Sequence, residues 1–224
     1  MTDTVCQPAY STVEECPVMR DDVIATHPEG YQKFAYTQIK KGSDFSIQKT
    51  PIASLLTFIP NLPLYNAFAA HAGSLNVLPD PDSYVRRTSL MLLANGTPYP
   101  SLALEMARVA LGEEIAVEFD QNSKVKELKF AKSGRNIPVT PLGTMDINFR
   151  GPANSFPYVS ALDVLNDEKD EIEINSGRHL ASAKMSKKEL LQDAIVIIGV
   201  SALGVFDMRA FPFDSNTPGV EGHA

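Results

Sequence analysis

The sequence lacks an uninterrupted apolar run of the roughly 18–20 residues that a bilayer-spanning helix requires. The two longest candidates are residues 55–72, which Pro60 and Pro63 interrupt, and residues 194–206, which are too few. The N-terminus also lacks the basic start and apolar stretch of a signal peptide. We therefore expect a soluble chain, and a soluble piece cut from a membrane protein fits the same observations.

Basic residues are outnumbered, with 20 Lys and Arg against 27 Asp and Glu, a net charge of −7 and an isoelectric point near 5.1. Neutralising the phosphates of a nucleic acid requires clustered Lys and Arg. The charge balance therefore argues against a nucleic-acid binder, and for the same reason against a polybasic membrane-surface protein.

Cysteine is scarce too, because Cys6 and Cys16 are the only two. They lack the C-x-x-C spacing of a zinc or redox site, and both a disulfide and free thiols stay open. The four histidines have no metal-ligand spacing with one another, with Cys or with a carboxylate: His27, His71, His179 and His223. His71, among alanines, is expected to be a hydrogen-bonded, half-buried side chain, and no cofactor is expected.

What the sequence has is enough apolar residues, 44% of 224, for a sizeable core in one large domain or two small ones. Residues 1–50 are weakly patterned, with one strand expected near residues 31–39. Residues 74–78 and 84–94 are expected to form strands around a Pro-Asp turn, and the Asn-Gly pair at 95–96 predicts a hairpin.

Further along, residues 115–119 and 125–131 predict a second hairpin. The clearest helix begins at Ser101 and ends before Gly112, and shorter helices are expected at 160–166 and 186–193. Residues 167–184 are charged and are expected to form an exposed insertion.

Residues 194–200 are continuously apolar and β-branched, as in a strand buried on both faces of a parallel or mixed sheet. We therefore predict an α/β fold: a single-domain α/β sandwich over residues 1–224, with a mixed central sheet, helices on its faces and an antiparallel hairpin excursion.

The turn Gly199–Gly204 follows this expected strand and could cradle a phosphate. It lacks both the P-loop and the dinucleotide-binding patterns, and a strand exit that needs small residues is the simpler interpretation. Ser201 does not lie in the G-x-S-x-G pattern of a hydrolase nucleophile. The residues alone therefore indicate no catalytic set.

Asp207 and Arg209 are two residues apart on an extended segment, so their side chains face the same side. They could bind a polar ligand or form a structural ion pair. Arg86, Arg87 and Arg150 are the other basic residues near turns, and for each of them solvated charge is the simpler interpretation.

Several segments, in order along the chain, carry the patterns of one known family. They are AGSLN at 72–76, PDPDSYVRR at 79–87, YPSLALE at 99–105, INFRGP at 147–152, FPYVSALDVL at 156–165, IVIIG at 195–199, DMR at 207–209 and PGVEGHA at 218–224. The chain resembles the second class of CHASE domain, the sensory extracellular domain associated with cyclases and histidine kinases. Ser83 stands where this family often has Gly, Phe211 where it often has Thr, and Gly222 where an aliphatic residue is usual.

The resemblance, recognisable over residues 72–224, implies a domain on the periplasmic or extracellular side of a bacterial cytoplasmic membrane. One transmembrane helix would precede it and several would follow. The implied output is a cytoplasmic class III adenylate or guanylate cyclase, because residues 206–221 are most similar to the cyclase-linked members. A histidine kinase or a Ser/Thr kinase is the alternative output.

The resemblance also implies that this chain is a ligand-sensing domain rather than an enzyme, with an unknown small molecule or protein as its stimulus. Homodimerisation is expected, because cyclase and kinase outputs work as dimers. Arg150, Asp207 and Arg209 are the candidate ligand contacts. The rival hypotheses are a free-standing α/β enzyme or nucleotide-binding protein that uses the Gly199–Gly204 turn, and a structural or adhesion module.

Overall fold

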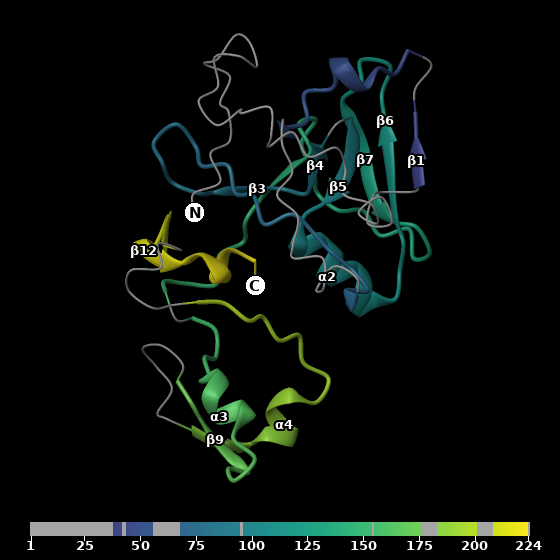
Figure 1. The fold of residues 1–224 in the computed structure, drawn as a ribbon. Coiled ribbons are helices and arrows are strands. Elements are labelled where there is room, and N and C mark those ends of the chain that lie inside the picture. Colours follow the sequence, from purple (N-terminus) through teal and green to yellow (C-terminus); the bar gives the residue numbers. More distant parts are fainter. Residues whose placement is uncertain are drawn as a thin grey trace, which may run out of the picture. The chain divides into compact units, whose positions relative to one another are not determined.

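The computed structural model describes residues 38–41, 44–55, 68–94, 96–153, 155–175, 183–200 and 208–223. These residues form short helices and several small sheets, which confirms the predicted α/β class (Figure 1). The chain divides into two compact units, of which the first comprises residues 1–76 and 89–145, and the second residues 77–88 and 146–224. No helix among the described residues is long and apolar enough to span a membrane.

The first unit contains a mixed sheet in the order β1 (Gln38–Lys40), β6 (Ile115–Phe119) and β7 (Val125–Phe130). β1 is parallel to β6, whereas β6 and β7 are antiparallel, which confirms the hairpin predicted there. Asp120 closes the hairpin turn, because its Oδ1 accepts the backbone N–H groups of Asn122 and Lys124.

A second mixed sheet has the order β2 (Ser54–Leu55), β4 (Met91–Ala94) and β5 (Thr97–Pro100), with β2 parallel to β4 and β4 antiparallel to β5. The tight β4–β5 connection confirms the hairpin predicted at the Asn-Gly pair. Gly96 has φ +75°, the left-handed conformation for which this turn uses glycine, and residue 95 lies outside the described residues.

Helix α2 (Leu102–Leu111) forms where the sequence predicts it, because both of its ends are capped locally. Ser101 Oγ accepts the N–H of Leu104, and Gly112 ends the helix in the left-handed conformation. The segment before it approaches so closely that a Cβ at Gly73 would lie 2.5 Å from Leu102 Cα. The strand predicted at 74–78 is wrong: only Ser74 forms a bridge, to Ser101, since the chain here follows the helix start rather than a sheet.

The hydrophobic core of the first unit lies between these sheets and α2. The 3-10 helix η3 (Ile47–Lys49) contributes Ile47 at its margin. The buried members of this core are Ile52, Leu90, Met91, Leu93, Leu104, Ile115, Val117, Phe119, Val125, Leu128 and Phe130. Strands β3 (Arg87–Ser89) and β8 (Thr144–Asp146) pair where the chain passes from one unit to the other.

The second unit contains α3 (Ala161–Leu165), the antiparallel pair β9 (Glu171–Ile174) and β10 (Ala183–Ser186), and α4 (Lys187–Leu191). Both predicted helices are thus present, and Ser186 with Glu189 forms a capping box at α4. The expected exposed insertion contains the β9–β10 pair, whose Ile172 is buried. The antiparallel strands β11 (Met208–Phe211) and β12 (Asp214–Pro218) lead into the 3-10 helix η4 (Gly219–Gly222).

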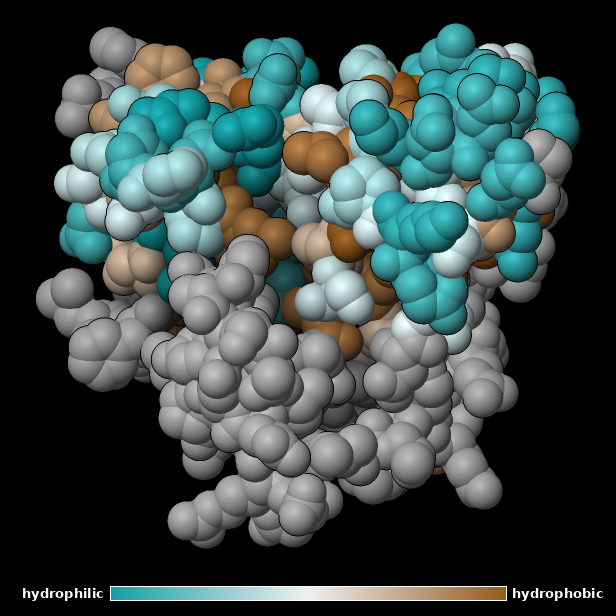
Figure 2. Space-filling view, turned by 90° about the horizontal axis from the view of Figure 1, so that it is seen from above, coloured by the Kyte–Doolittle hydropathy of each residue, from teal (hydrophilic) through white to brown (hydrophobic). Residues whose placement is uncertain are grey.

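The buried strand predicted at residues 194–200 is wrong. The segment lies outside every strand of the described residues. Its side chains are exposed except for the half-buried Ile197, and Ile198 is 89% exposed. An apolar run is buried only where a partner strand pairs with it, and the run itself does not specify that partner. Figure 2 shows both apolar side chains, in brown, and polar ones, in teal, at the surface of the described residues.

Candidate functional site

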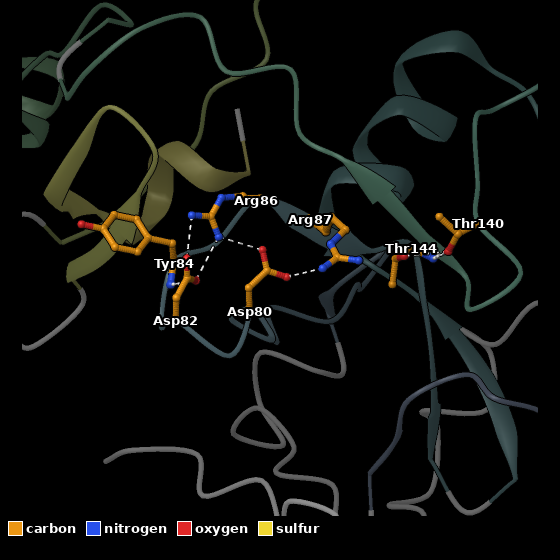
Figure 3. Close-up of polar contacts among 7 residues, drawn as sticks. All are labelled: Asp80, Asp82, Tyr84, Arg86, Arg87, Thr140 and Thr144. Atoms are coloured by element: carbon orange, nitrogen blue, oxygen red, sulfur yellow. Dashed lines mark hydrogen bonds and ion pairs between the residues drawn. The ribbon is translucent and has the colours of Figure 1, made fainter.

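The turn at residues 79–87, in the second unit, brings together two aspartates and two arginines (Figure 3). Its backbone closes through two bonds, from Ser83 N–H to Asp80 O and from Asp80 N–H to Tyr84 O, each 2.8 Å. Asp82 Oδ1 accepts the N–H of Tyr84 at 3.1 Å, as aspartate does in tight turns. Ser83 has φ +70°, the conformation that explains why the family often has glycine there.

Two carboxylates and two guanidinium groups meet in this turn. Arg86 binds Asp82 in the bidentate manner, with Nη1–Oδ1 2.9 Å and Nη2–Oδ2 2.7 Å. Asp80 joins both arginines, with Oδ2 3.1 Å from Nη1 of Arg86 and Oδ1 2.5 Å from Nη2 of Arg87. We call these four residues, Asp80, Asp82, Arg86 and Arg87, the Asp–Arg cluster.

Electrostatics favours the charged forms of Asp80, Asp82 and Arg86. The hydrogen bonds from Arg86, and then the N–H of Tyr84, lower the pKa of Asp82 to about 2. Arg87 and then Arg86 likewise lower the pKa of Asp80. Asp82 and Asp80 in turn raise the pKa of Arg86 above its already high ordinary value. Carboxylates that stay ionised in this way are unsuited to general acid catalysis near neutral pH.

The cluster holds a loop in place and presents a half-exposed polar surface. Asp80 is only 14% exposed in its side chain, whereas Arg86 is 44% exposed and also lies 5.4 Å from the ring centroid of Tyr84. Between them, Val85 is buried and donates its N–H to Ala210 O at 2.8 Å. The turn is thereby bonded to β11, the strand that carries Arg209.

The predicted ligand contacts fall on neighbouring segments. Arg209 is exposed on β11, and its Nη1 donates to Met208 O at 3.3 Å. Arg150 is exposed just after Phe149, whose ring centroid lies 5.2 Å from that of Phe211. The two arginines therefore belong to segments joined by a ring contact. Asp207 lies outside the described residues, so its predicted pairing with Arg209 stays a prediction.

Sequence reasoning missed the Asp–Arg cluster. It expected solvated charge at Arg86 and Arg87, but both side chains form ion pairs while staying half exposed. The signal that could have found them is the spacing of two aspartates and two arginines across one proline-containing turn, which brings opposite charges within reach. At His71 the expectation is confirmed, because its Nδ1 lies 3.0 Å from Arg108 Nη2.

A hydrogen bond also joins the 3-10 helix η4 to the segment before α3. Tyr158 Oη donates to Glu221 Oε1 of η4 at 2.5 Å, and burial followed by this bond raises the pKa of Tyr158. Gly199 approaches the same turn, since a Cβ there would lie 2.7 Å from Val220 Cβ. This supports the small-residue interpretation of Gly199, while residues 201–204 of its turn lie outside the described residues. Within the described part of the chain, no group of three His, Cys, Asp or Glu is arranged to hold a metal.

The model of one protein family, the CHASE2 domain, matches residues 17–224. No curated protein and no solved structure matches the chain. Because the match covers more than half of the sequence, the chain belongs to the CHASE2 family, as the resemblance predicted. CHASE2 domains are sensory, non-catalytic domains of signalling receptors and are generally extracellular.

Proposed function

We propose that this CHASE2 chain is the periplasmic or extracellular sensor of a bacterial transmembrane receptor whose output is a cytoplasmic adenylate or guanylate cyclase. The family match over residues 17–224 carries the sensory part of the proposal. The cyclase is favoured over a histidine or Ser/Thr kinase by the sequence of residues 206–221, which is most similar to the cyclase-linked members. The domain would lie next to the membrane and act as a homodimer.

Within this domain we propose Arg150, Asp207 and Arg209 as contacts for the stimulus, a small molecule or a protein. Arg209 lies on β11, to which the turn of the Asp–Arg cluster is bonded through Val85 N–H. Arg150 lies next to the ring contact between Phe149 and Phe211. A stimulus that binds one packing of these segments better than another would shift the receptor between two states.

The experiment uses the full-length receptor encoded by the gene, expressed in a bacterium that lacks its own cyclases. Accumulation of cyclic AMP or cyclic GMP would support the cyclase output. Phosphate transfer from ATP to a receptor histidine, serine or threonine, with no cyclic nucleotide formed, would instead support the kinase output and contradict the cyclase output. A reading frame with neither membrane helices nor an output domain would overturn the receptor proposal and reopen the enzyme and adhesion hypotheses.

The ligand contacts are tested in the same receptor with Arg209→Ala and Arg150→Ala. Arg135→Ala is the matched control, since Arg135 is an exposed arginine of a turn in the other unit. We expect changed output with an unchanged melting temperature for Arg209→Ala and Arg150→Ala, and neither change for the control. Unchanged output in both variants would remove these arginines as contacts.

A further inference from the structure

One ring nitrogen of His71, Nδ1, lies close to a hydrogen-bond acceptor and to a hydrogen-bond donor. Nδ1 lies 3.1 Å from Oε1 of Glu105 and 3.0 Å from Nη2 of Arg108. A carboxylate oxygen can only accept a hydrogen bond, and a guanidinium nitrogen can only donate one. Nδ1 must carry a proton to bond to Glu105 and must lack one to bond to Arg108. The two contacts therefore cannot both be hydrogen bonds in one protonation state.

The partners of His71 are themselves fixed. Glu105 is a buried residue of α2, and its carboxylate accepts Nε of Arg108 at 2.9 Å and Nη2 at 2.8 Å. Nη1 of Arg108 donates to Glu114 Oε1 at 3.0 Å and to Glu113 O at 3.3 Å. The side chain of Glu113 instead accepts the N–H of Ser133. Glu105 and Arg108 thus face the imidazole directly, and Glu114 is linked to it through Arg108.

The backbone that carries His71 is also held in place. Ala69 and Ala72 pack against Ala94 and Tyr99, and Gly73 lies against the first residue of α2. His71 itself is 46% exposed in its side chain, so a proton from solvent can reach it. The ring therefore meets Glu105 and Arg108 in a fixed position and in contact with water.

We propose that His71 is a proton-operated switch on α2. When neutral, Nδ1 accepts the N–H of Arg108. Protonation turns Nδ1 into a donor to Glu105 and places a second positive charge against Arg108, which loses that bond. Histidine is the side chain that most often serves as a proton switch in proteins, and protonation of His71 changes how the segment around it is attached to α2. This inference concerns the 224-residue chain by itself and does not depend on the receptor's output.

Nuclear magnetic resonance of the ¹⁵N-labelled chain tests the switch directly. The nitrogen shifts of an imidazole distinguish a protonated from an unprotonated Nδ1. We expect an unprotonated Nδ1 at pH 8 and, on acidification, protonation of His71 together with a shift of the Arg108 side-chain resonances. A proton on Nδ1 at pH 8, or Arg108 resonances that do not follow the titration of His71, would overturn the proposal.

Amide hydrogen exchange supplies the second readout. Corrected for the intrinsic pH dependence, exchange in the 105–108 turn of α2 should change about two- to tenfold from pH 8 to pH 5, because a hydrogen bond to Arg108 is exchanged for one to Glu105. His71→Asn keeps a polar group near the position of Nδ1 but does not titrate, so its corrected exchange should not depend on pH. His223→Asn, at a histidine of the other unit, should behave like the wild type. Equal pH dependence in His71→Asn would contradict the switch, and the wild-type resonance experiment stands even if that variant fails to fold.

Discussion

The two units of this molecule are stabilised in different ways. In the first, large side chains such as Met91, Phe119 and Leu128 are almost completely buried in one continuous core. In the second, buried apolar residues such as Val85, Ile172 and Phe211 lie on separate segments. Burial of apolar surface therefore contributes most to the first unit, whereas hydrogen-bonded turns and single ring contacts take a larger share in the described part of the second.

This difference indicates where a sensor of this kind can move. Segments with few buried apolar contacts open at a lower free-energy cost than a continuous core. The predicted stimulus contacts Arg150 and Arg209 lie in the second unit, and so do the Asp–Arg cluster and the Tyr158–Glu221 bond. We therefore expect the described segments of the second unit to open at a lower free-energy cost than the continuous core of the first.

The largest effect should come from matched leucines in the two units. Leu128→Ala removes a buried side chain from the core of the first unit and should lower the free energy of unfolding by about 2–5 kcal/mol. Leu162→Ala, at a residue of α3 that is 80% exposed, should change it by less than about 0.5 kcal/mol. Urea denaturation measures both. Equal losses would show that α3 is packed in solution and would remove the contrast between the units.

The next effect concerns the pair Phe211 and Gly222. A Cβ at Gly222 would lie 2.8 Å from Cζ of Phe211, so Gly222→Ile should overpack the site and cost about 1–3 kcal/mol. Phe211→Thr should also destabilise, by leaving a cavity, but the double variant should be more stable than the sum of the single losses. A double-mutant cycle by denaturation checks this coupling. Additive losses of stability would show that the Phe211 ring does not occupy the space that an aliphatic side chain at position 222 would fill.

A smaller gain is expected at Ser83, whose φ of +70° is unfavourable for a residue with a Cβ. Ser83→Gly should stabilise the second unit by about 0.5–1 kcal/mol, net of the greater freedom of glycine in the unfolded chain. Ser83→Ala is the control, because it keeps the Cβ and removes only the hydroxyl. A gain in the alanine variant equal to that in the glycine variant would assign the effect to the hydroxyl instead.

The smallest effect should be that of acid on the Asp–Arg cluster, because solvent and salt screen its half-exposed pairs. The pKa of Asp82 is about 2 in the folded chain, below the ordinary value of about 3.9 expected when unfolded. Its contribution to stability is therefore present above about pH 4 and is lost as the pH falls through about 2. Asp82→Asn should flatten the dependence of unfolding free energy on pH between about 5 and 2. An unchanged slope would mean that the pairing does not persist in solution.

The sequence predicts best the features whose causes are local. Helix α2 is predictable because its caps, Ser101 and Gly112, are adjacent to it, and the β6–β7 hairpin because its turn residues lie between its strands. The conformation of residues 194–200 is not predictable in this way, since their burial depends on a partner strand that the apolar run does not specify. Family membership was predictable from ordered short patterns that no single residue reveals.

The candidate site shows the same limit. Arg86 and Arg87 are visible in the sequence, but their pairing with Asp80 depends on how the intervening turn folds. The opposed contacts of His71 join residues more than thirty positions apart. Propensity and spacing therefore find the residue types of a site, whereas its hydrogen bonds and ion pairs require the three-dimensional structure.

The contact between Phe211 and Gly222 also bears on the order in which these two residues evolved. Both residues differ from the usual family pattern, and the Phe211 ring fits only because position 222 has no side chain. An ancestor with an aliphatic side chain at position 222 could not have accepted the phenylalanine ring first without a clash. The loss of the side chain at position 222 would have come first, opening a space that the aromatic ring later filled. Relatives of this chain should therefore include ones with glycine at 222 and a small residue at 211, and lack the opposite combination.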